Sequence, residues 1–260
     1  MTIATMRPRG RPLLRASVDP SDNTVDLGVV RPASRLQWDR PVTGAVYGCL
    51  LNFQCELDQL GERIHQPPYN GPPTGPVVYV KTPNTHIASG VPVPIPDDVR
   101  QVRVGPALGV LIGETLCRAN ADQARSAIVG YTVVNDITVP HDSLFRQPLK
   151  HKCRDGFCPI GPWLVDADDL PDPATLTMRA YVNGECRHES RLDQLVRPVA
   201  TLLADISDFT SLYPGDLVLA GVPTGTPLAG AGDTVAVEID GIGRLENPLV
   251  RETDWQESAS

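Results

Sequence analysis

Residues Leu149–Val165, LKHKCRDGFCPIGPWLV, hold the densest group of side chains that could do chemistry. Lys152 and Arg154 are cations able to hold an anionic substrate, and Asp155 could bind a polar group beside them. The prolines of the stretch lack backbone donors, and its glycines permit conformations that other residues avoid. The sequence therefore predicts a stiff, shaped loop that carries cations.

Each of these residues also has a simpler interpretation. Lys152 and Arg154 are equally compatible with solvated surface charges, and Asp155 followed by Gly156 is ordinary turn chemistry. Cys158 is more typical of a small buried hydrophobic residue than of a nucleophile. On these interpretations the loop serves only folding or a subunit contact.

The bulk properties exclude several classes of protein. The chain has 260 residues and a formal charge of -8. We see neither a basic stripe of the kind that binds nucleic acid nor an apolar run of the roughly 20 residues that a membrane span needs. The basic N-terminal residues lack the apolar segment of a secretory signal. The six cysteines have no CxxC pair and no zinc-ligand spacing, which favours reduced thiols in the cytoplasm.

The elements that must position the loop are predicted to be mostly strands. With 26 Pro and 22 Gly the chain favours short strands over long helices. Apolar runs predict strands over residues 44–52, 76–80, 106–113, 215–221 and 233–250, with a helix running into a strand over 121–136. Residues 175–187 predict a hairpin that turns at Asn183-Gly184. Helical spacing predicts helices over residues 55–64 and 194–209, and Asn120 is a plausible helix cap.

These elements predict an α+β fold dominated by strands, with a few peripheral helices around a rolled sheet. We expect a fold domain over residues 46–250 and a C-terminal tail over 251–260. Residues 1–45 are rich in Arg, Pro and Asp, and only TVDLGVV reads as a strand there. They predict an irregular arm or small N-terminal subdomain.

Several long motifs, in this order, carry a family resemblance. GYTVVNDIT, KCRDGFCPIGPWLV, YVNGE, ISDFTSLYPGDLVLAGVPTG and GDTVAVEIDGIGRLENPLV together resemble the fumarylacetoacetate hydrolase superfamily. LNFQCELDQL and QPPYNGPPTGPVVYVKTPNT are similar to the N-terminal half, or separate first subunit, of the bifunctional isomerase/decarboxylases of 4-hydroxyphenylacetate (homoprotocatechuate) degradation. The resemblance implies a mixed β-roll and cleavage, decarboxylation or isomerisation of 2-oxo acids through an enolate.

The resemblance also implies a divalent metal, Mg²⁺ or Mn²⁺, held by a Glu-x-Glu pair and an Asp. The Asp is retained as Asp136, but the Glu-x-Glu positions fall on Gly105 and Ala107. The family Thr of the GTP motif falls on Val222. Because Mg²⁺ wants about six oxygens, one carboxylate is too few to hold it tightly. We therefore expect a broken metal site, with Asp136 as its one remaining ligand.

The resemblance assigns roles to the residues that remain. Lys152, Glu56 and Asp136 are the expected catalytic residues, and Arg154, Asp155 and Lys152 are expected to bind substrate. Glu56 stands where the family has a proton-carrying His, and a carboxylate there acts as a base only if burial raises its pKa.

Simpler roles remain open for Asp136 and His141. Asp136 could instead bond a loop backbone. His141, with Asp142 beside it, is either a replacement proton carrier or an exposed loop residue.

Three functions follow. The first is a subunit of an isomerase/decarboxylase acting on unsaturated 2-oxo di- and tricarboxylates in aromatic catabolism. The second is a stand-alone lyase or hydrolase with an altered, metal-light site, and the third is a degenerate structural partner of a complete homologue. We expect a small acidic 2-oxo acid as substrate and a homodimer, or a heteromer with a homologous metal-binding subunit. Strand edges that would otherwise invite aggregation favour such association.

Overall fold

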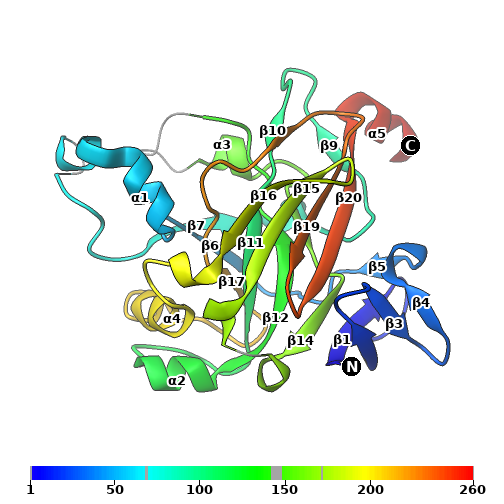
Figure 1. The fold of residues 1–260 in the computed structure, drawn as a ribbon, viewed down its shortest axis with the longest axis horizontal. Helices are drawn as coiled ribbons and strands as arrows, with labels where there is room; N and C mark the ends of the chain where they lie inside the picture. Colours follow the sequence, from blue (N-terminus) through cyan, green and yellow to red (C-terminus); the bar gives the residue numbers. More distant parts are fainter. Residues whose placement is uncertain (1, 68–69, 142–147, 171, 260) are drawn as a thin grey trace.

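The computed structural model describes residues 2–67, 70–141, 148–170 and 172–259. Three sheets hold most of the regular secondary structure, and the helices lie outside them (Figure 1). The predicted strand-dominated α+β fold is confirmed. None of the helices in the described ranges combines the length and the apolar character needed to cross a membrane.

The largest sheet has 13 strands, with the main order β4-β3-β2-β1-β14-β12-β11-β17-β6-β7. Its strands are β1 (Thr2–Pro8), β2 (Leu14–Asp19), β3 (Thr24–Asp26), β4 (Val30–Pro32), β5 (Trp38–Asp39), β6 (Val46–Leu50), β7 (Val77–Lys81), β8 (His86–Ala88), β11 (Pro106–Ile112), β12 (Ile128–Asn135), β13 (Cys158–Ile160), β14 (Trp163–Asp166) and β17 (Leu217–Leu219).

A five-stranded sheet packs against the large one in the order β16-β15-β19-β20-β9. It consists of β9 (Val93–Ile95), β15 (Thr177–Val182), β16 (Glu185–Arg191), β19 (Thr234–Ile239) and β20 (Gly243–Arg251). A small third sheet pairs β10 (Val102–Arg103) with β18 (Leu228–Ala229). The sheets are mixed, because β17 runs parallel to β6, β13 to β8 and β20 to β9.

The main core lies between the two larger sheets. Strands β11 and β12 contribute Leu108, Val110 and Val133, and the five-stranded sheet contributes Met178 and Val237, all buried in one cluster. Burying such side chains stabilises the fold by roughly 1.5–3 kcal/mol each. The strands that carry the site are therefore anchored from behind.

Five α-helices cover the periphery of the described chain: α1 (Gln54–Leu60), α2 (Ala121–Ser126), α3 (Leu149–Lys152), α4 (Val199–Ser207) and α5 (Glu252–Ala259). Helices α2 and α4 pack against each other at one end of the molecule (Figure 1). The predicted cap of α2 is confirmed, since Asn120 Oδ1 accepts the N–H of Gln123 at 2.9 Å. Helix α4 begins at Val199 rather than at 194, because Pro198 cannot donate to a preceding turn.

The N-terminal segment, predicted as an irregular arm or small subdomain, contains paired strands. Strands β1 and β2 pair over five positions, and β1 joins the large sheet through β14. The alternating burial of β1 explains why it is a strand: Ala4 and Met6 point into the core. The predicted division at residues 45 and 250 stays a prediction.

The hairpin and the shaped loop are as expected from their sequences. Asn183 and Gly184 both have positive φ, as a two-residue turn requires, and they join β15 to β16. Residues Leu149–Val165 form the short helix α3, a turn at Gly156, strand β13, a cis Gly161-Pro162 bond and strand β14. The stretch thus joins the large sheet through β13, which contains Pro159, and through β14, which follows Pro162.

Candidate active site

A pocket of about 290 Å³ opens where β6, β10 and β12 end, beside α1 and the last residue of α3. Its lining includes Leu51, Glu56, Arg103, Asp136, Thr138 and Lys152. A larger cavity, of about 740 Å³, lies elsewhere against the N-terminal strands, and none of these six residues lines it. The smaller pocket is the candidate active site because it gathers all three predicted catalytic residues.

Asp136 is the centre of a buried charge cluster. It follows directly after β12 and is 1% exposed. Lys81 Nζ lies 2.8 Å from its Oδ1, and Lys152 Nζ lies 2.6 Å from its Oδ2. Tyr79 donates its hydroxyl hydrogen to the same Oδ2. A carboxylate with three donors is held in one orientation.

The two lysines differ in how many of their hydrogens are already used. An ammonium group has three N–H donors. Lys81 donates to the carbonyls of Ile137 and Lys152, at 3.2 and 2.7 Å, and its fully buried side chain forms an ion pair with Asp136 Oδ1. Lys152 donates to Asp136 and to Thr138 Oγ1 at 2.8 Å, and it lines the pocket. Its Nζ also lies 4.5 Å from the centroid of the Tyr79 ring, so one N–H of Lys152 has no oxygen acceptor among the described residues.

The cluster carries an excess of positive charge. Two ammonium groups face one carboxylate, so the group has a net charge of +1 when all three members are ionised. Burial raises the pKa of Asp136, but Lys152 and Lys81 outweigh burial and hold that pKa well below its ordinary value. Burial lowers the pKa of Lys152, an effect that Asp136 opposes and Lys81 adds to. An anion at the pocket wall would relieve this imbalance.

Glu56 supplies a carboxylate with the opposite tendency. Burial raises the pKa of Glu56 to about 7, against the lowering effect of the backbone N–H groups that donate to it and of Lys152. Its Oε1 accepts from Leu51 N at 3.1 Å and its Oε2 from Phe53 N at 3.0 Å. These bonds hold the carboxylate at the start of α1.

Backbone strain lies next to this carboxylate. Leu51 has φ +58°, an uncommon value for a bulky residue, and its side chain lines the pocket. The N–H of Leu51 is the donor to Glu56 Oε1. Glu56 therefore helps to hold the strained turn that shapes one pocket wall.

Arg103 adds a second cation to the pocket lining. Its Nη1 donates to the carbonyl of Thr226 at 2.9 Å, which leaves most of its guanidinium donors for another partner. Backbone bonds between Arg103 and Thr138 hold β10 against the segment that follows Asp136. Lys152 and Arg103 thus line one pocket from two separate elements.

The other predicted residues lie away from this lining. Arg154 Nε donates to the carbonyl of Lys150, and Asp155 is exposed and accepts from Asn84 Nδ2 at 2.6 Å. Neither is among the described residues that line the pocket, so their substrate contact stays a prediction. Cys158 is fully buried, and burial raises the pKa of its thiol to about 12, as suits a small core residue.

His141 lines the pocket, and its ring lies 4.6 Å from that of His151. Asp142, the proposed partner of His141, lies outside the described residues.

Sequence reasoning missed Lys81 and Tyr79. Both lie on β7, two residues apart, so they point to the same face of the strand. The stretch VVYVK carries the signal, because Lys81 alternates with Tyr79 on one face of the strand. That face is buried, whereas Val80 on the other face is exposed. A strand lysine on the inward face needs a buried partner.

The residues present do not fit the metal that the resemblance implies. A Cβ at Gly105 would lie 2.1 Å from the backbone oxygen of Asp136, so that position cannot carry a carboxylate without a backbone shift. Ala107 is fully buried in an apolar cluster with Val134 and Ile160. Both oxygens of Asp136 already face ammonium groups. Among the described residues no group of three or more His, Cys, Asp or Glu has metal-binding geometry.

Known proteins resemble this chain in sequence and fold. The 4-hydroxyphenylacetate degradation bifunctional isomerase/decarboxylase of Salmonella dublin is 37% identical over 213 residues, which cover 82% of this chain and 48% of that protein. The chain thus spans about half the length of that relative.

Two solved structures share the fold. The 2-hydroxyhepta-2,4-diene-1,7-dioate isomerase of Mycobacterium marinum has a TM-score of 0.78 at 27% identity, with 97% of this chain and 99% of that chain covered. Maleylpyruvate hydrolase from Sphingobium sp. SYK-6, solved with manganese(II) and pyruvate, has a TM-score of 0.75 at 21% identity, with 95% and 99% covered. A divalent metal is therefore found within this fold.

The family model described as fumarylacetoacetate (FAA) hydrolase C-terminal matches residues 45–250, most of the chain. Together with the ordered motifs and the shared fold, this match shows that the chain belongs to the fumarylacetoacetate hydrolase family.

Proposed function

We propose that this chain is one half of an isomerase/decarboxylase acting on unsaturated 2-oxo di- and tricarboxylates in 4-hydroxyphenylacetate catabolism. The observation that carries the proposal is the buried excess of positive charge on Lys81, Asp136 and Lys152, which faces a pocket beside Glu56. An acidic 2-oxo acid brings the carboxylate and the developing enolate oxygen that such a pocket stabilises.

Three of the pocket residues, Arg103, Lys152 and Glu56, have a role in this proposal. Arg103 pairs with a substrate carboxylate, and the remaining N–H of Lys152 donates to the 2-oxo oxygen. Glu56 removes a proton from the adjacent carbon; the C–H electron pair forms the carbon–carbon double bond of the enolate, and charge moves onto the oxygen at Lys152. Return of the proton from Glu56 to a different carbon completes an isomerisation. A pKa of about 7 suits a group that must both take and give a proton near neutral pH.

We further propose that this half works without a divalent metal of its own. Gly105, Ala107 and the occupied oxygens of Asp136 support this view. The match covers 48% of the Salmonella dublin relative, which supports a second, homologous roll as partner. Retained carboxylates in that roll would carry the metal-dependent decarboxylation. Arg154 and Asp155 then belong to the loop that supports Lys152 rather than to the pocket wall.

The test is proton exchange in the isolated chain. A 2-oxo acid such as 2-oxoglutarate is incubated in D₂O, and loss of its C3 proton signal is followed by NMR with and without Mg²⁺. We expect exchange by the wild type, independent of Mg²⁺ and at least tenfold slower in Glu56→Gln. Glu62→Gln, which removes an exposed carboxylate from the segment after α1, should match the wild type.

The same sample then tests the division of labour. Addition of a homologous metal-binding chain should add decarboxylation that depends on Mg²⁺. If the wild type exchanges no faster than buffer alone, the pocket is not catalytic and the chain is a structural partner. If Glu56→Gln exchanges as fast as an active wild type, Glu56 is not the base.

A further inference from the structure

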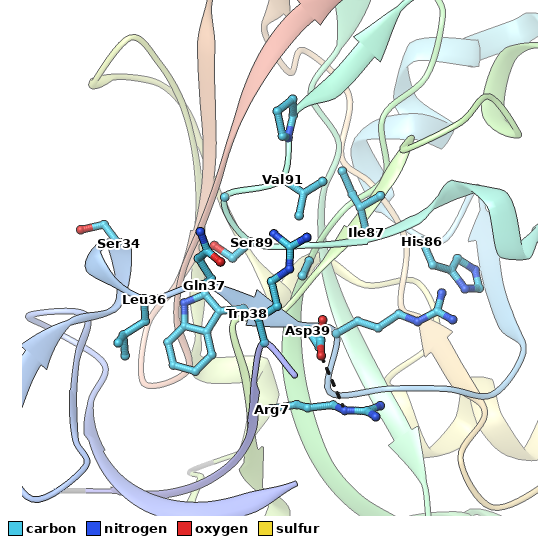
Figure 2. Close-up of a pocket in the computed structure, with 15 residues that line it drawn as sticks. Arg7, Ser34, Leu36, Gln37, Trp38, Asp39, His86, Ile87, Ser89 and Val91 are labelled. Atoms are coloured by element: carbon cyan, nitrogen blue, oxygen red, sulfur yellow. Dashed lines mark ion pairs between the residues drawn. The ribbon is translucent and has the colours of Figure 1, made fainter. Parts of the chain in front are cut away.

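The larger cavity, of about 740 Å³, lies between the N-terminal strands and the segment that runs from His86 to Pro92 (Figure 2). Strands β1 and β5 form one wall, and β8 with the loop after it forms the other. None of the residues assigned above to the active site lines it. Whatever binds there makes its contacts apart from the proposed chemistry.

The cavity is lined by more cations than anions. Arg7, Arg9 and Arg40 face it, with Asp39 as the one carboxylate among the described lining residues. Asp39 Oδ2 accepts from Gly10 N at 3.1 Å and lies 3.9 Å from Arg7 Nε. The dashed line in Figure 2 marks this ion pair. The single negative charge is therefore already committed to Arg7.

Arg40 is the residue that points to a ligand. Its side chain is half-buried, yet no ion pair or hydrogen bond of its guanidinium occurs within the described chain. Arg9 is exposed and likewise has no side-chain partner there. A guanidinium presents five N–H donors in a planar fork suited to a carboxylate or phosphate. Two such forks without a protein partner at one cavity are suited to an oxyanion.

Apolar side chains form part of the remaining lining, and Trp38 among them is firmly held. In Figure 2 Leu36 and Trp38 lie to the left of Asp39 and Arg7, Val91 lies above them, and Ile87 lies beside His86. Trp38 is buried: its Nε1 donates to the carbonyl of Ala33 at 2.9 Å. Its ring packs edge-on against Trp163, with centroids 6.1 Å apart. This preformed wall favours an apolar group next to the charge.

We propose that this cavity is a second binding site, for a small organic oxyanion whose carboxylate or phosphate pairs with Arg40 and Arg9 and whose apolar body packs on Trp38 and Val91. Asp39 limits the affinity, because its negative charge repels part of any anion bound between the arginines. The site is independent of the proposed isomerase chemistry and does not rest on it.

Binding by the purified full chain tests the proposal. Titration calorimetry with benzoate, phenyl phosphate and inorganic phosphate separates the two oxyanion types from the contribution of the apolar body. We expect saturable binding of benzoate or phenyl phosphate, at least fivefold tighter than that of inorganic phosphate. Arg40→Gln should weaken it at least tenfold. Arg35→Gln, which removes an exposed arginine from the same segment but outside the cavity lining, should leave it within twofold of wild type.

Three further variants make the result decisive. Arg9→Gln, at an exposed position, should weaken binding severalfold even if Arg40→Gln fails to fold. Asp39→Asn should strengthen it, and Lys152→Met should retain it, since Lys152 lines the other pocket. The absence of saturable binding by either organic probe, or equal affinity in Arg9→Gln and wild type, would overturn the proposal. So would loss of binding in Lys152→Met with Arg9→Gln unaffected.

Discussion

Lys152 and Asp136 are 16 residues apart in the chain, yet Nζ of the first lies 2.6 Å from Oδ2 of the second inside the protein. Lys81, from a more distant strand, holds the other oxygen at 2.8 Å. One carboxylate thus joins β7, the segment after β12 and helix α3. We expect this junction to contribute both to the stability of the fold and to substrate binding at the pocket.

Asp136→Asn should strongly destabilise the protein. The substitution leaves two buried ammonium groups without a counter-charge, and breaking a buried pair in this way costs about 3–5 kcal/mol. Urea unfolding measures the loss. Asp98→Asn, at an exposed position, should change the free energy of unfolding by about 0.5 kcal/mol or less. A small effect at Asp136 would mean that the cluster is not ionised as described.

The two lysines should separate stability from activity. Lys81→Met leaves two buried carbonyls without their donor and should lower the free energy of unfolding more than Lys152→Met does. Lys152→Met removes the one N–H left for substrate and should slow proton exchange at least tenfold. Urea unfolding and NMR exchange on both variants check the order. Slower proton exchange in Lys81→Met than in Lys152→Met would instead assign the substrate contact to Lys81.

Ionisation of Glu56 should make the protein less stable as the pH rises. Burial raises the pKa of Glu56 from 4.5 to about 7, so the folded state binds the extra proton more tightly than the unfolded state does. The contribution of Glu56 to stability is fully present below about pH 4.5, and it is lost as the pH rises through about 7. The full change is about 3 kcal/mol.

Comparison with Glu56→Gln isolates that effect. Between pH 5 and about 8 the free energy of unfolding of the wild type should fall relative to that of Glu56→Gln. Glu62→Gln, at an exposed position, should run parallel to the wild type over the same range. A difference between wild type and Glu56→Gln that does not change with pH would show that Glu56 stays charged throughout.

Restoring a side chain at position 105 should damage the fold rather than rebuild a metal site. In Gly105→Ala the new Cβ would lie 2.1 Å from the Asp136 carbonyl oxygen, and strain of this kind typically costs at least 1–3 kcal/mol. Gly75→Ala, where nothing lies within 4 Å, serves as the control in thermal unfolding. Unchanged stability in Gly105→Ala would mean that the backbone yields and that the metal position is recoverable.

Association should be visible in the mass of the purified protein. The chain has a mass of 28.1 kDa, and we expect a dimer of twice that value in sedimentation or light scattering. With a homologous metal-binding chain we expect a heteromer that carries isomerase and decarboxylase activity together. A fully active monomer would contradict both expectations.

The local elements of this protein follow from its sequence. The Asn183-Gly184 turn, the Asn120 cap and the alternation in the core strands depend on neighbouring residues, so their signals are complete in a short stretch. Lys152, Asp136 and Glu56 could be selected because ordered motifs mark their positions. The substitutions at Gly105 and Ala107 were also readable from the sequence.

The tertiary structure decided which of these residues meet. Lys81 becomes a partner of Asp136 only because β7 and the segment after β12 lie side by side, a contact between positions 55 residues apart that periodicity alone does not encode. Arg154 follows Lys152 by two residues, beyond the end of α3, and its Nε donates to the carbonyl of Lys150. The charge of Glu56 depends on burial by distant segments, and burial, unlike residue type, exists only in the folded chain.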